Sequence, residues 1–303
     1  HPVYSFFLEK SKKTIIENFD YKINVNINSL GFRGEEFDFV NSNNNILVLG
    51  DSYAFGSGVD NNETFPSLLE QYFDKIGNPV NVLNASVPAW GSTQKLLFLQ
   101  REGRKFNPSL ILWEFCETDF EHNLQFDLHE VIDDKLVYIP PKPSTRDILR
   151  SYTRFIPFYS WLVQRSHMVS LIRRSVLLGI NKYASTKNNN SSETMVEKNN
   201  NEEKRTLMEK LTQEILLTSE NMDVPILPIF IPSGGKEIEK HGYSFVVDSL
   251  YKLFNSKNIF FIDFTYLGFD HSIRFKSDGH WRAKAHKLAA DSLYNYIIKN
   301  PYF

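Results

Sequence analysis

The chain has 303 residues, enough for one large α/β domain or two small domains, and its 42% hydrophobic content can build a substantial core. Its 34 Lys and Arg residues nearly balance 36 Asp and Glu residues, with no basic tract, so nucleic-acid binding is not expected. The single cysteine, Cys116, excludes an internal disulfide and a zinc site built on cysteines.

Five short apolar runs alternate with amphipathic stretches along the chain. The runs are uninterrupted, which is typical of parallel strands covered on both faces. They are Ile46–Leu49, Val80–Leu83, Leu110–Phe115, Val224–Ile231 and Ile259–Phe264. The helical stretches are Phe65–Lys75, Ser92–Gly103, Thr206–Ser219, Tyr243–Asn255 and Arg282–Lys299. This alternation predicts an α/β fold with a doubly wound, five-stranded parallel sheet.

No repeat or composition shift divides the chain, so we expect one domain over residues 1–303, with an N-terminal lead-in at 1–40. Residues 121–205 interrupt the pattern between the third and fourth strands. They predict a helical insertion that ends in a mobile Asn-rich loop at about 184–204. A lid over the active site and packing at the sheet edge fit the bulky residues of this insertion equally well. Contact with a membrane surface is a third interpretation.

The first apolar run stops abruptly in ILVLGDSYAFG, residues 46–56. Gly50 allows a sharp turn, and Ser52 then opens the next segment at the carboxyl end of the strand, where open parallel sheets bind ligands. Backbone N–H groups at such a turn stabilise the negative charge that develops on a carbonyl oxygen during acyl transfer. A plain strand-to-helix turn with a capping serine has the same local sequence. The interpretation as a nucleophile therefore depends on finding a base.

Of the eight histidines, His280 is the best placed to activate the serine hydroxyl. It lies in Lys276-Ser-Asp-Gly-His-Trp281, between the last strand and the last helix, again at the carboxyl edge of the sheet. Asp278 can fix the tautomer of His280 and stabilise its protonated form. We therefore expect Ser52 as nucleophile, His280 as base and Asp278 as its partner. No metal-binding histidine spacing, nucleotide loop or redox motif occurs, so neither a metal nor a cofactor is expected.

From Ser29 to Ala290 the chain resembles the SGNH (GDSL-like) hydrolases in three ordered motifs. The first is Gly50-Asp-Ser-Tyr-Ala-Phe-Gly-Ser-Gly-Val59, the second Asn84-Ala-Ser-Val-Pro-Ala-Trp-Gly-Ser-Thr-Gln94, and the third Asp278-Gly-His-Trp281. The lead-in Asn28-Ser-Leu-Gly-Phe-Arg-Gly34 is similar to that of bacterial envelope-associated members. The resemblance implies a flavodoxin-like three-layer sandwich with the same roles for Ser52, His280 and Asp278. His286 matches a second histidine of the motif and is expected to be a helix residue.

The resemblance also implies an oxyanion hole built from the N–H groups of Ser52 and Gly91. Family members usually add an asparagine after the third strand, at the position that Thr118 occupies here. A threonine hydroxyl reaches less far than an amide, and Asn123 could replace it only if the loop folds back. Three interpretations stay open: a slower enzyme, a differently built hole, or a site that binds without chemistry.

The residues beside the motifs form the candidate substrate-binding set. They are Asp51, Tyr53, Trp90, Trp281 and Asn123. The aromatic members could stack on a sugar ring or simply wall the pocket.

The leading hypothesis is a serine esterase or O-acyltransferase that works through an acyl-Ser52 intermediate on an acylated carbohydrate or small ester. The alternatives are a lipid or short-chain ester hydrolase and a degenerate glycan-binding protein. The chain begins with His1 rather than Met, so a preceding segment that brings it close to a membrane is compatible with the sequence. A bacterial envelope location is favoured over the cytoplasm.

Overall fold

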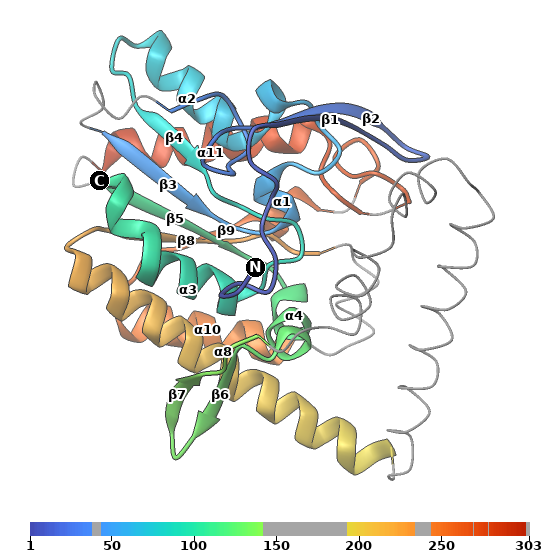
Figure 1. The fold of residues 1–303 in the computed structure, drawn as a ribbon, viewed down its shortest axis with the longest axis vertical. Coiled ribbons are helices and arrows are strands. Elements are labelled where there is room, and N and C mark those ends of the chain that lie inside the picture. Colours follow the sequence, from blue (N-terminus) through green and yellow to red (C-terminus); the bar gives the residue numbers. More distant parts are fainter. Residues whose placement is uncertain (38–43, 142–192, 234–243, 269, 278, 301–303) are drawn as a thin grey trace, which may run out of the picture. The chain divides into compact units, whose positions relative to one another are not determined.

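The computed structural model describes all residues except 38–43, 142–192, 234–243, 269, 278 and 301–303 (Figure 1). By its contacts the chain divides into two compact units. The first comprises His1–Ile139 and Lys204–Phe303, and the second comprises Pro140–Glu203. The parallel sheet and the candidate site both belong to the first unit. Among the described helices, none has the length and apolar character that crossing a membrane requires.

A five-stranded parallel sheet forms the centre of the first unit. Its strands are β3 (Asn45–Leu49), β4 (Asn81–Asn84), β5 (Leu110–Phe115), β8 (Ile226–Phe230) and β9 (Ile262–Asp263). They pair in the order β4-β3-β5-β8-β9, which is the flavodoxin-like order with its switch point beside β3 (Figure 1). The predicted α/β class and the five parallel strands are therefore confirmed.

Helices cover both faces of this sheet (Figure 1). On one face lie α2 (Phe65–Lys75) and α11 (Ala283–Lys299), and on the other lie α3 (Ser92–Glu102), α10 (Ser244–Ser256) and the Lys204–Met222 part of α8 (Glu193–Met222). Successive strand residues point to opposite faces. Leu47 and Leu49 accordingly pack against α3, whereas Ile46 and Val48 pack against α2. This three-layer arrangement explains why the strands read as continuous apolar runs.

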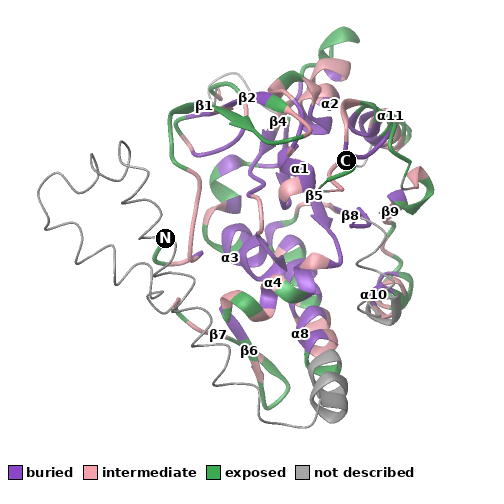
Figure 2. Ribbon diagram, turned by 90° about the vertical axis from the view of Figure 1, so that its right-hand side faces the viewer, coloured by how far each residue is buried: buried purple, intermediate pink, exposed green. Residues whose placement is uncertain are grey.

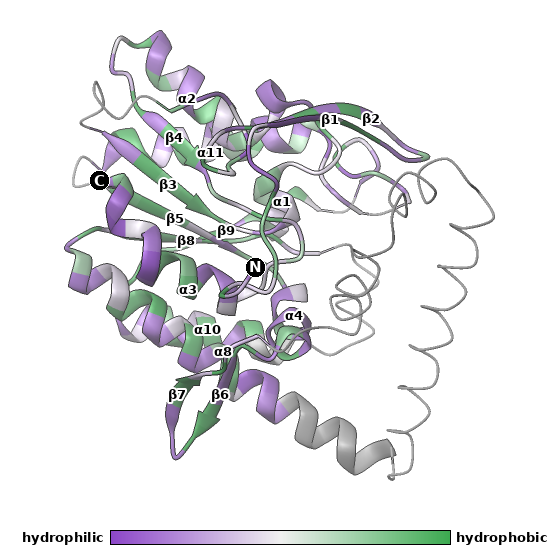
Figure 3. Ribbon diagram, in the orientation of Figure 1, coloured by the Kyte–Doolittle hydropathy of each residue, from purple (hydrophilic) through white to green (hydrophobic). Residues whose placement is uncertain are grey.

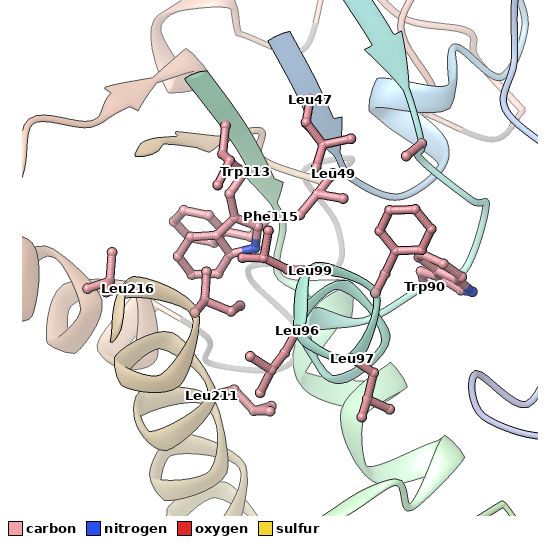
Figure 4. Close-up of a cluster of buried hydrophobic side chains, with 14 of the residues drawn as sticks. Leu47, Leu49, Trp90, Leu96, Leu97, Leu99, Trp113, Phe115, Leu211 and Leu216 are labelled. Carbon is pink, nitrogen blue, oxygen red and sulfur yellow. The ribbon is translucent and has the colours of Figure 1, made fainter. Parts of the chain in front are cut away.

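The layer on the α3 side is rich in aromatic side chains. Figure 4 shows Trp113 and Phe115 of β5 facing α8, with Leu211 and Leu216 opposite and Leu96 and Leu99 of α3 close by. β5 and β8 are largely hydrophobic in Figure 3 and buried in Figure 2. A rigid sheet of this kind fixes the ends of its strands, where the candidate residues are carried.

Two antiparallel hairpins are added to the sheet-and-helix core. The first pairs β1 (Lys12–Glu17) with β2 (Lys22–Ile27) inside the lead-in, and the second pairs β6 (His129–Ile132) with β7 (Lys135–Tyr138). The short helices α1 (Ser52–Phe55) and α4 (Thr118–Phe126) follow β3 and β5 directly. Single 3₁₀ turns lie at Asn61–Glu63, Gly103–Phe106 and Phe264–Leu267.

The segment between β5 and β8 is described in part. Residues 193–204 of the expected Asn-rich loop belong to helix α8, so the loop expected at about 184–204 is helical in that part. Lys204 is buried and pairs with Glu121 of α4 at 2.6 Å, a contact within the first unit. The bulky stretch at 142–180 lies outside the described residues. The interpretations of it as a lid, an edge or a membrane contact stay predictions.

Candidate active site

Ser52 stands at the carboxyl end of β3, in a turn that the surrounding side chains fix closely. A Cβ at Gly50 would lie 2.5 Å from the Cβ of Ala54 and 2.5 Å from Oε2 of Glu114, so only glycine fits there. The N–H of Asp51 donates to Glu114 Oε2 at 2.7 Å, and Asp51 Oδ1 accepts from the N–H of Tyr53 at 2.8 Å. These contacts present Ser52 as the half-exposed first residue of α1.

His280 reaches Ser52 from the opposite end of the chain. Its Nε2 lies 2.8 Å from Ser52 Oγ, a hydrogen-bond distance, and both residues are only half-buried. With the ring proton on Nδ1, Nε2 accepts the serine proton, as a general base must. The structure thus brings together the two expected catalytic residues, 228 positions apart. Asp278 lies outside the described residues, so its expected contact with His280 stays a prediction.

The expected oxyanion donors differ in their availability. The N–H of Ser52 lies in the first turn of α1, where N–H groups have no acceptor within the helix. Gly91 is buried, and its N–H donates to Oε1 of Gln94 at 3.0 Å as part of the cap of α3. The structure therefore does not leave the Gly91 N–H open toward Ser52, because Gln94 already accepts it.

Ala89, two residues before Gly91, lies in an unusual turn beside the nucleophile segment. It is half-exposed, and its φ of +66° is in the left-handed region that favours glycine. Trp90 N–H donates to Val87 C=O at 3.0 Å, so Ala89 is the third residue of a β-turn with the positive φ of a type II turn. Val87 N–H in turn donates to Gly50 C=O at 3.1 Å, which holds the turn against the Gly50–Ser52 segment. Strained backbone of this kind is frequent at functional sites.

Thr118 is linked to the nucleophile turn through a thiol. Its Oγ1 lies 2.9 Å from Sγ of Cys116, and that thiol donates to Asp51 Oδ2 at 3.0 Å. Burial raises the pKa of Cys116 well above its usual value, with Asp51 adding to the effect, so the thiol stays protonated. Thr118 is itself half-exposed. Its hydroxyl is therefore connected through Cys116 to Asp51, the residue before Ser52.

Beneath the turn lies a buried cluster of charged and polar groups. Its members are Asp51, Ser92, Lys95, Glu114 and Asp119, all at most 1% exposed. Lys95 Nζ contacts Asp119 Oδ2 at 2.8 Å and the Glu114 C=O at 2.8 Å, and Ser92 Oγ donates to Asp119 Oδ2 at 2.6 Å. Burial, the largest influence, acts to lower the pKa of Lys95, but Asp119 and the other neighbouring acidic groups together outweigh it and the pKa is raised. Burial, followed by Asp51, raises the pKa of Glu114 well above its usual value.

Ligand atoms of Asp51, Glu114 and Cys116 lie within 4.8 Å of one another, a spacing that could suit a metal ion. These groups are bonded to the protein, however: Glu114 accepts from the Asp51 N–H, and the Cys116 thiol donates to Asp51. Lys95 also brings a positive charge to the same cluster. The chemistry of this donor set fits a hydrogen-bond network that shapes the Ser52 turn.

The structure corrects most of the expected substrate-binding set. Trp90 and Trp281 are fully buried, the former against Tyr4 and Phe98 and the latter in the layer on the α11 side, so neither offers a face to a sugar. Figure 4 shows Trp90 packed beside α3.

The polar members of the set are also engaged. Asn123 is buried, and its Oδ1 accepts from the Thr93 N–H at 3.0 Å. Asp51 is occupied in the turn described above. Tyr53, 5% exposed, has its ring 5.3 Å from that of His280, so it packs beside this histidine and offers little surface to a ligand.

Two other histidines are neutral core residues. Burial, with Arg33 and His280 adding to it, lowers the pKa of His286 to about 3, and its Nδ1 accepts from the Phe65 N–H at 3.3 Å. His286 lies in α11, as expected. Burial lowers the pKa of His129 to about 4, and its ring hydrogen-bonds the hydroxyl of Thr93. Neither ring is placed to act as a base for Ser52.

Comparison with known proteins gives matches only among solved structures. No family model matches the chain, and no curated protein matches it. The psychrotrophic esterase EstA of Pseudoalteromonas sp. aligns over 85% of this chain and 98% of its own, with 16% identity and a TM-score of 0.48. The acetyl xylan esterase AlAXEase covers 84% and 99%, with 11% identity and a TM-score of 0.48. The family 3 carbohydrate esterase of Clostridium thermocellum covers 84% and 96%, with 10% identity and a TM-score of 0.46.

The likeness to these structures is distant. The parallel sheet and the Ser52–His280 pair described above are features of this chain itself.

Three residues near the site were not predicted from the sequence. Ala89 gives no signal in sequence, because alanine rarely adopts positive φ. A lysine within an amphipathic helix, such as Lys95, is ordinarily expected to be exposed. Arg274, which donates to the hydroxyl of Tyr53 and to the C=O of Gly279, belongs to no motif. The one available hint was Pro88, since proline at the second position of a turn favours a type II geometry when a positive φ follows.

Proposed function

We propose that this chain is a serine esterase or O-acyltransferase that forms an acyl-Ser52 intermediate. The observation that supports this most directly is the 2.8 Å contact between Ser52 Oγ and His280 Nε2 in a half-exposed position at the carboxyl edge of the sheet. A serine held in hydrogen-bond contact with an imidazole is the minimal unit of nucleophilic acyl transfer. The buried network beneath the turn adds rigidity to the nucleophile.

In this mechanism His280 Nε2 takes the proton of Ser52 while Oγ attacks the carbonyl carbon of the ester. The carbonyl oxygen becomes negative, and we assign its stabilisation to the N–H groups of Ser52 and Ala89 and to the hydroxyl of Thr118. When the C–O bond breaks, protonated His280 gives its proton to the leaving alcohol. The acyl group then stays on Ser52.

The second half of the reaction uses the same residues in reverse order. His280 takes a proton from water or from a sugar hydroxyl, and the resulting oxygen nucleophile attacks the acyl-Ser52 carbonyl. Water gives hydrolysis, and a sugar hydroxyl gives transfer. The similarity of residues 28–34 and 278–281 to bacterial envelope-associated SGNH hydrolases supports an O-acylated carbohydrate as substrate and an envelope location.

Turnover of p-nitrophenyl acetate tests this proposal. We expect the wild-type chain to release nitrophenol catalytically and Ser52→Ala and His280→Gln to lose nearly all of that rate. Addition of an oligosaccharide acceptor distinguishes hydrolysis from transfer in the second half of the reaction. An acyltransferase forms acylated sugar at the expense of free acetate, whereas an esterase gives acetate alone. Equal rates in the wild type and Ser52→Ala would contradict the acyl-Ser52 intermediate.

A further inference from the structure

His280 ends a tight loop whose backbone is closed by two hydrogen bonds. The Phe275 N–H donates to the His280 C=O at 2.9 Å, and the Gly279 N–H donates to the Phe275 C=O at 3.1 Å. Gly279 has a φ of +75°, which glycine adopts without strain. The Nε2 position of His280 therefore depends on where this loop as a whole is held.

Arg274 holds the loop from its inner side. Its side chain is 2% exposed, and a guanidinium so deeply buried is stable only when its N–H groups find acceptors. Nη2 donates to the Pro232 C=O at 2.6 Å and Nε donates to the Gly268 C=O at 3.2 Å. Arg274 is thereby anchored to the segments that follow β8 and β9.

The third nitrogen of the same guanidinium, Nη1, bridges the segments that carry Ser52 and His280. Nη1 donates to the Gly279 C=O at 2.9 Å and to the phenol oxygen of Tyr53 at 3.1 Å. Gly279 precedes His280, and Tyr53 follows Ser52. The Tyr53 hydroxyl also lies 3.5 Å from the Gly279 C=O, at the limit of a hydrogen bond. Burial raises the pKa of Tyr53 despite Arg274, so the phenol stays protonated and can accept from Nη1.

The tip of the β1–β2 hairpin holds the same loop from its outer side. Asp20 Oδ2 accepts from the Ser277 N–H at 2.9 Å and also contacts the Ser277 hydroxyl. The ring of Tyr21 packs against that of Phe275 with centroids 4.9 Å apart. Within the hairpin tip, Asn18 Oδ1 accepts from the N–H groups of Asp20 and Tyr21, which gives the tip a defined turn.

We propose that Arg274 and Asp20 are positioning residues for the Ser52–His280 pair. Arg274 sets the separation of the two segments through Tyr53 and Gly279, and Asp20 makes the N-terminal hairpin part of the catalytic apparatus. This inference rests on the proposed function, because it assumes that the pair performs the chemistry. Neither residue contacts Ser52 Oγ, so their effect is on the fraction of time that the pair is aligned.

The two residues can be separated by substitution. Asp20→Leu keeps the approximate size of the side chain but removes the oxygen that accepts from Ser277. Tyr53→Phe keeps the ring beside His280 and removes only the oxygen that Arg274 contacts. Arg274→Lys keeps a charge but cannot reach several acceptors at once. Glu17→Gln is the matched control, since Glu17 is in the same hairpin and, among the described residues, forms its ion pair with exposed Lys22 at 2.8 Å.

Two measurements decide the matter: kcat and KM on p-nitrophenyl acetate, and amide hydrogen exchange over residues 273–281. We expect kcat to fall roughly ten- to a hundredfold in Asp20→Leu and Tyr53→Phe, because small misplacements of reacting groups have effects of this size. KM and the melting temperature should change little, and exchange at Gly279 should become faster. Arg274→Lys is expected to show the same pattern more strongly. Glu17→Gln should match the wild type in every respect.

Each other outcome has a definite meaning. Wild-type kcat in Asp20→Leu and Tyr53→Phe would overturn the positioning role while leaving the proposed function intact. A fall in kcat that merely follows a lower melting temperature, with unchanged exchange at Gly279, would also overturn it, because the residues would then be structural only. An inert wild-type chain would remove the proposed function itself, and the positioning role with it.

Discussion

Nζ of Lys95 lies 2.8 Å from Oδ2 of Asp119, and both side chains are completely buried behind the Ser52 turn. Lys95 comes from α3 and Asp119 from α4, so the pair joins the helices that follow β4 and β5, the two strands on either side of β3. Lys95 Nζ also donates to the C=O of Glu114, near the end of β5. The ion pair therefore fixes the strand-end loops relative to one another.

Removal of one partner should leave a buried charge without compensation. We expect Lys95→Met to lower the free energy of unfolding by about 3–5 kcal/mol, the range found for broken buried ion pairs. Urea unfolding measures this directly, with Lys105→Met as the control at the exposed Lys105–Glu102 pair. A loss of unfolding free energy below about 1 kcal/mol, similar to that of the control, would show that the buried charge of Asp119 does not need Lys95 for compensation.

Acid should destabilise the protein through His286 and His129. In the unfolded chain both titrate near 6.5, whereas in the folded chain their pKa values are about 3 and about 4. The folded state thus binds fewer protons than the unfolded state below pH 6.5, so stability falls as the pH drops from 6.5 toward 4. Unfolding free energies across this range should fall less steeply for His286→Gln and His129→Gln. Exposed His271→Gln is the control, and an unchanged slope in both core variants would contradict this assignment.

The hydroxyl of Thr118 is expected to contribute to catalysis. Thr118→Val keeps the shape and removes the donor, and loss of one oxyanion donor typically lowers kcat on the order of 10²-fold. Thr118→Asn places an amide there, and we expect it to retain more activity than Thr118→Val. The measurement is kcat on p-nitrophenyl acetate, with Thr14→Val on the exposed strand β1 as control. If Thr118→Val reacts as fast as the wild type, the oxyanion hole does not include this hydroxyl.

Replacing Ala89 with glycine should stabilise the folded protein. Its φ of +66° strains a side chain with a Cβ but not glycine, and this gain exceeds the entropy that glycine loses on folding. We expect Ala89→Gly to raise the free energy of unfolding by roughly 0.5–1 kcal/mol. Ala283→Gly, in helix α11, should not raise it. A destabilised Ala89→Gly variant would contradict the left-handed conformation at this turn.

The sheet and the Ser52–His280 pair could be predicted because their signals are local. Uninterrupted apolar runs identify buried parallel strands, and Leu110–Phe115 has the same bounds in sequence and structure. A glycine and a serine after such a run also mark the edge where parallel sheets bind ligands. His280 was found by the same logic, because it too follows a strand.

Other features depend on contacts between distant segments. Lys95 is buried only because Asp119 is brought to it by another helix. The sequence around an aromatic residue beside a motif is the same whether its side chain faces solvent or the core. The burial of Trp90 and Trp281 could therefore not be predicted. The β1–β2 hairpin was missed because β1 is exposed along its whole length, although Ile23, Val25 and Ile27 of β2 alternate as a half-buried strand should.

The most direct test of the Ser52–His280 assignment is covalent labelling with a fluorophosphonate, read by intact mass and peptide mapping. A serine activated by a neighbouring imidazole attacks such a reagent, whereas an ordinary serine does not. We predict a single adduct on Ser52, absent in Ser52→Ala and much slower to form in His280→Gln. No adduct on the folded wild-type chain, or an adduct that persists in Ser52→Ala, would contradict the account of Ser52 as the activated nucleophile.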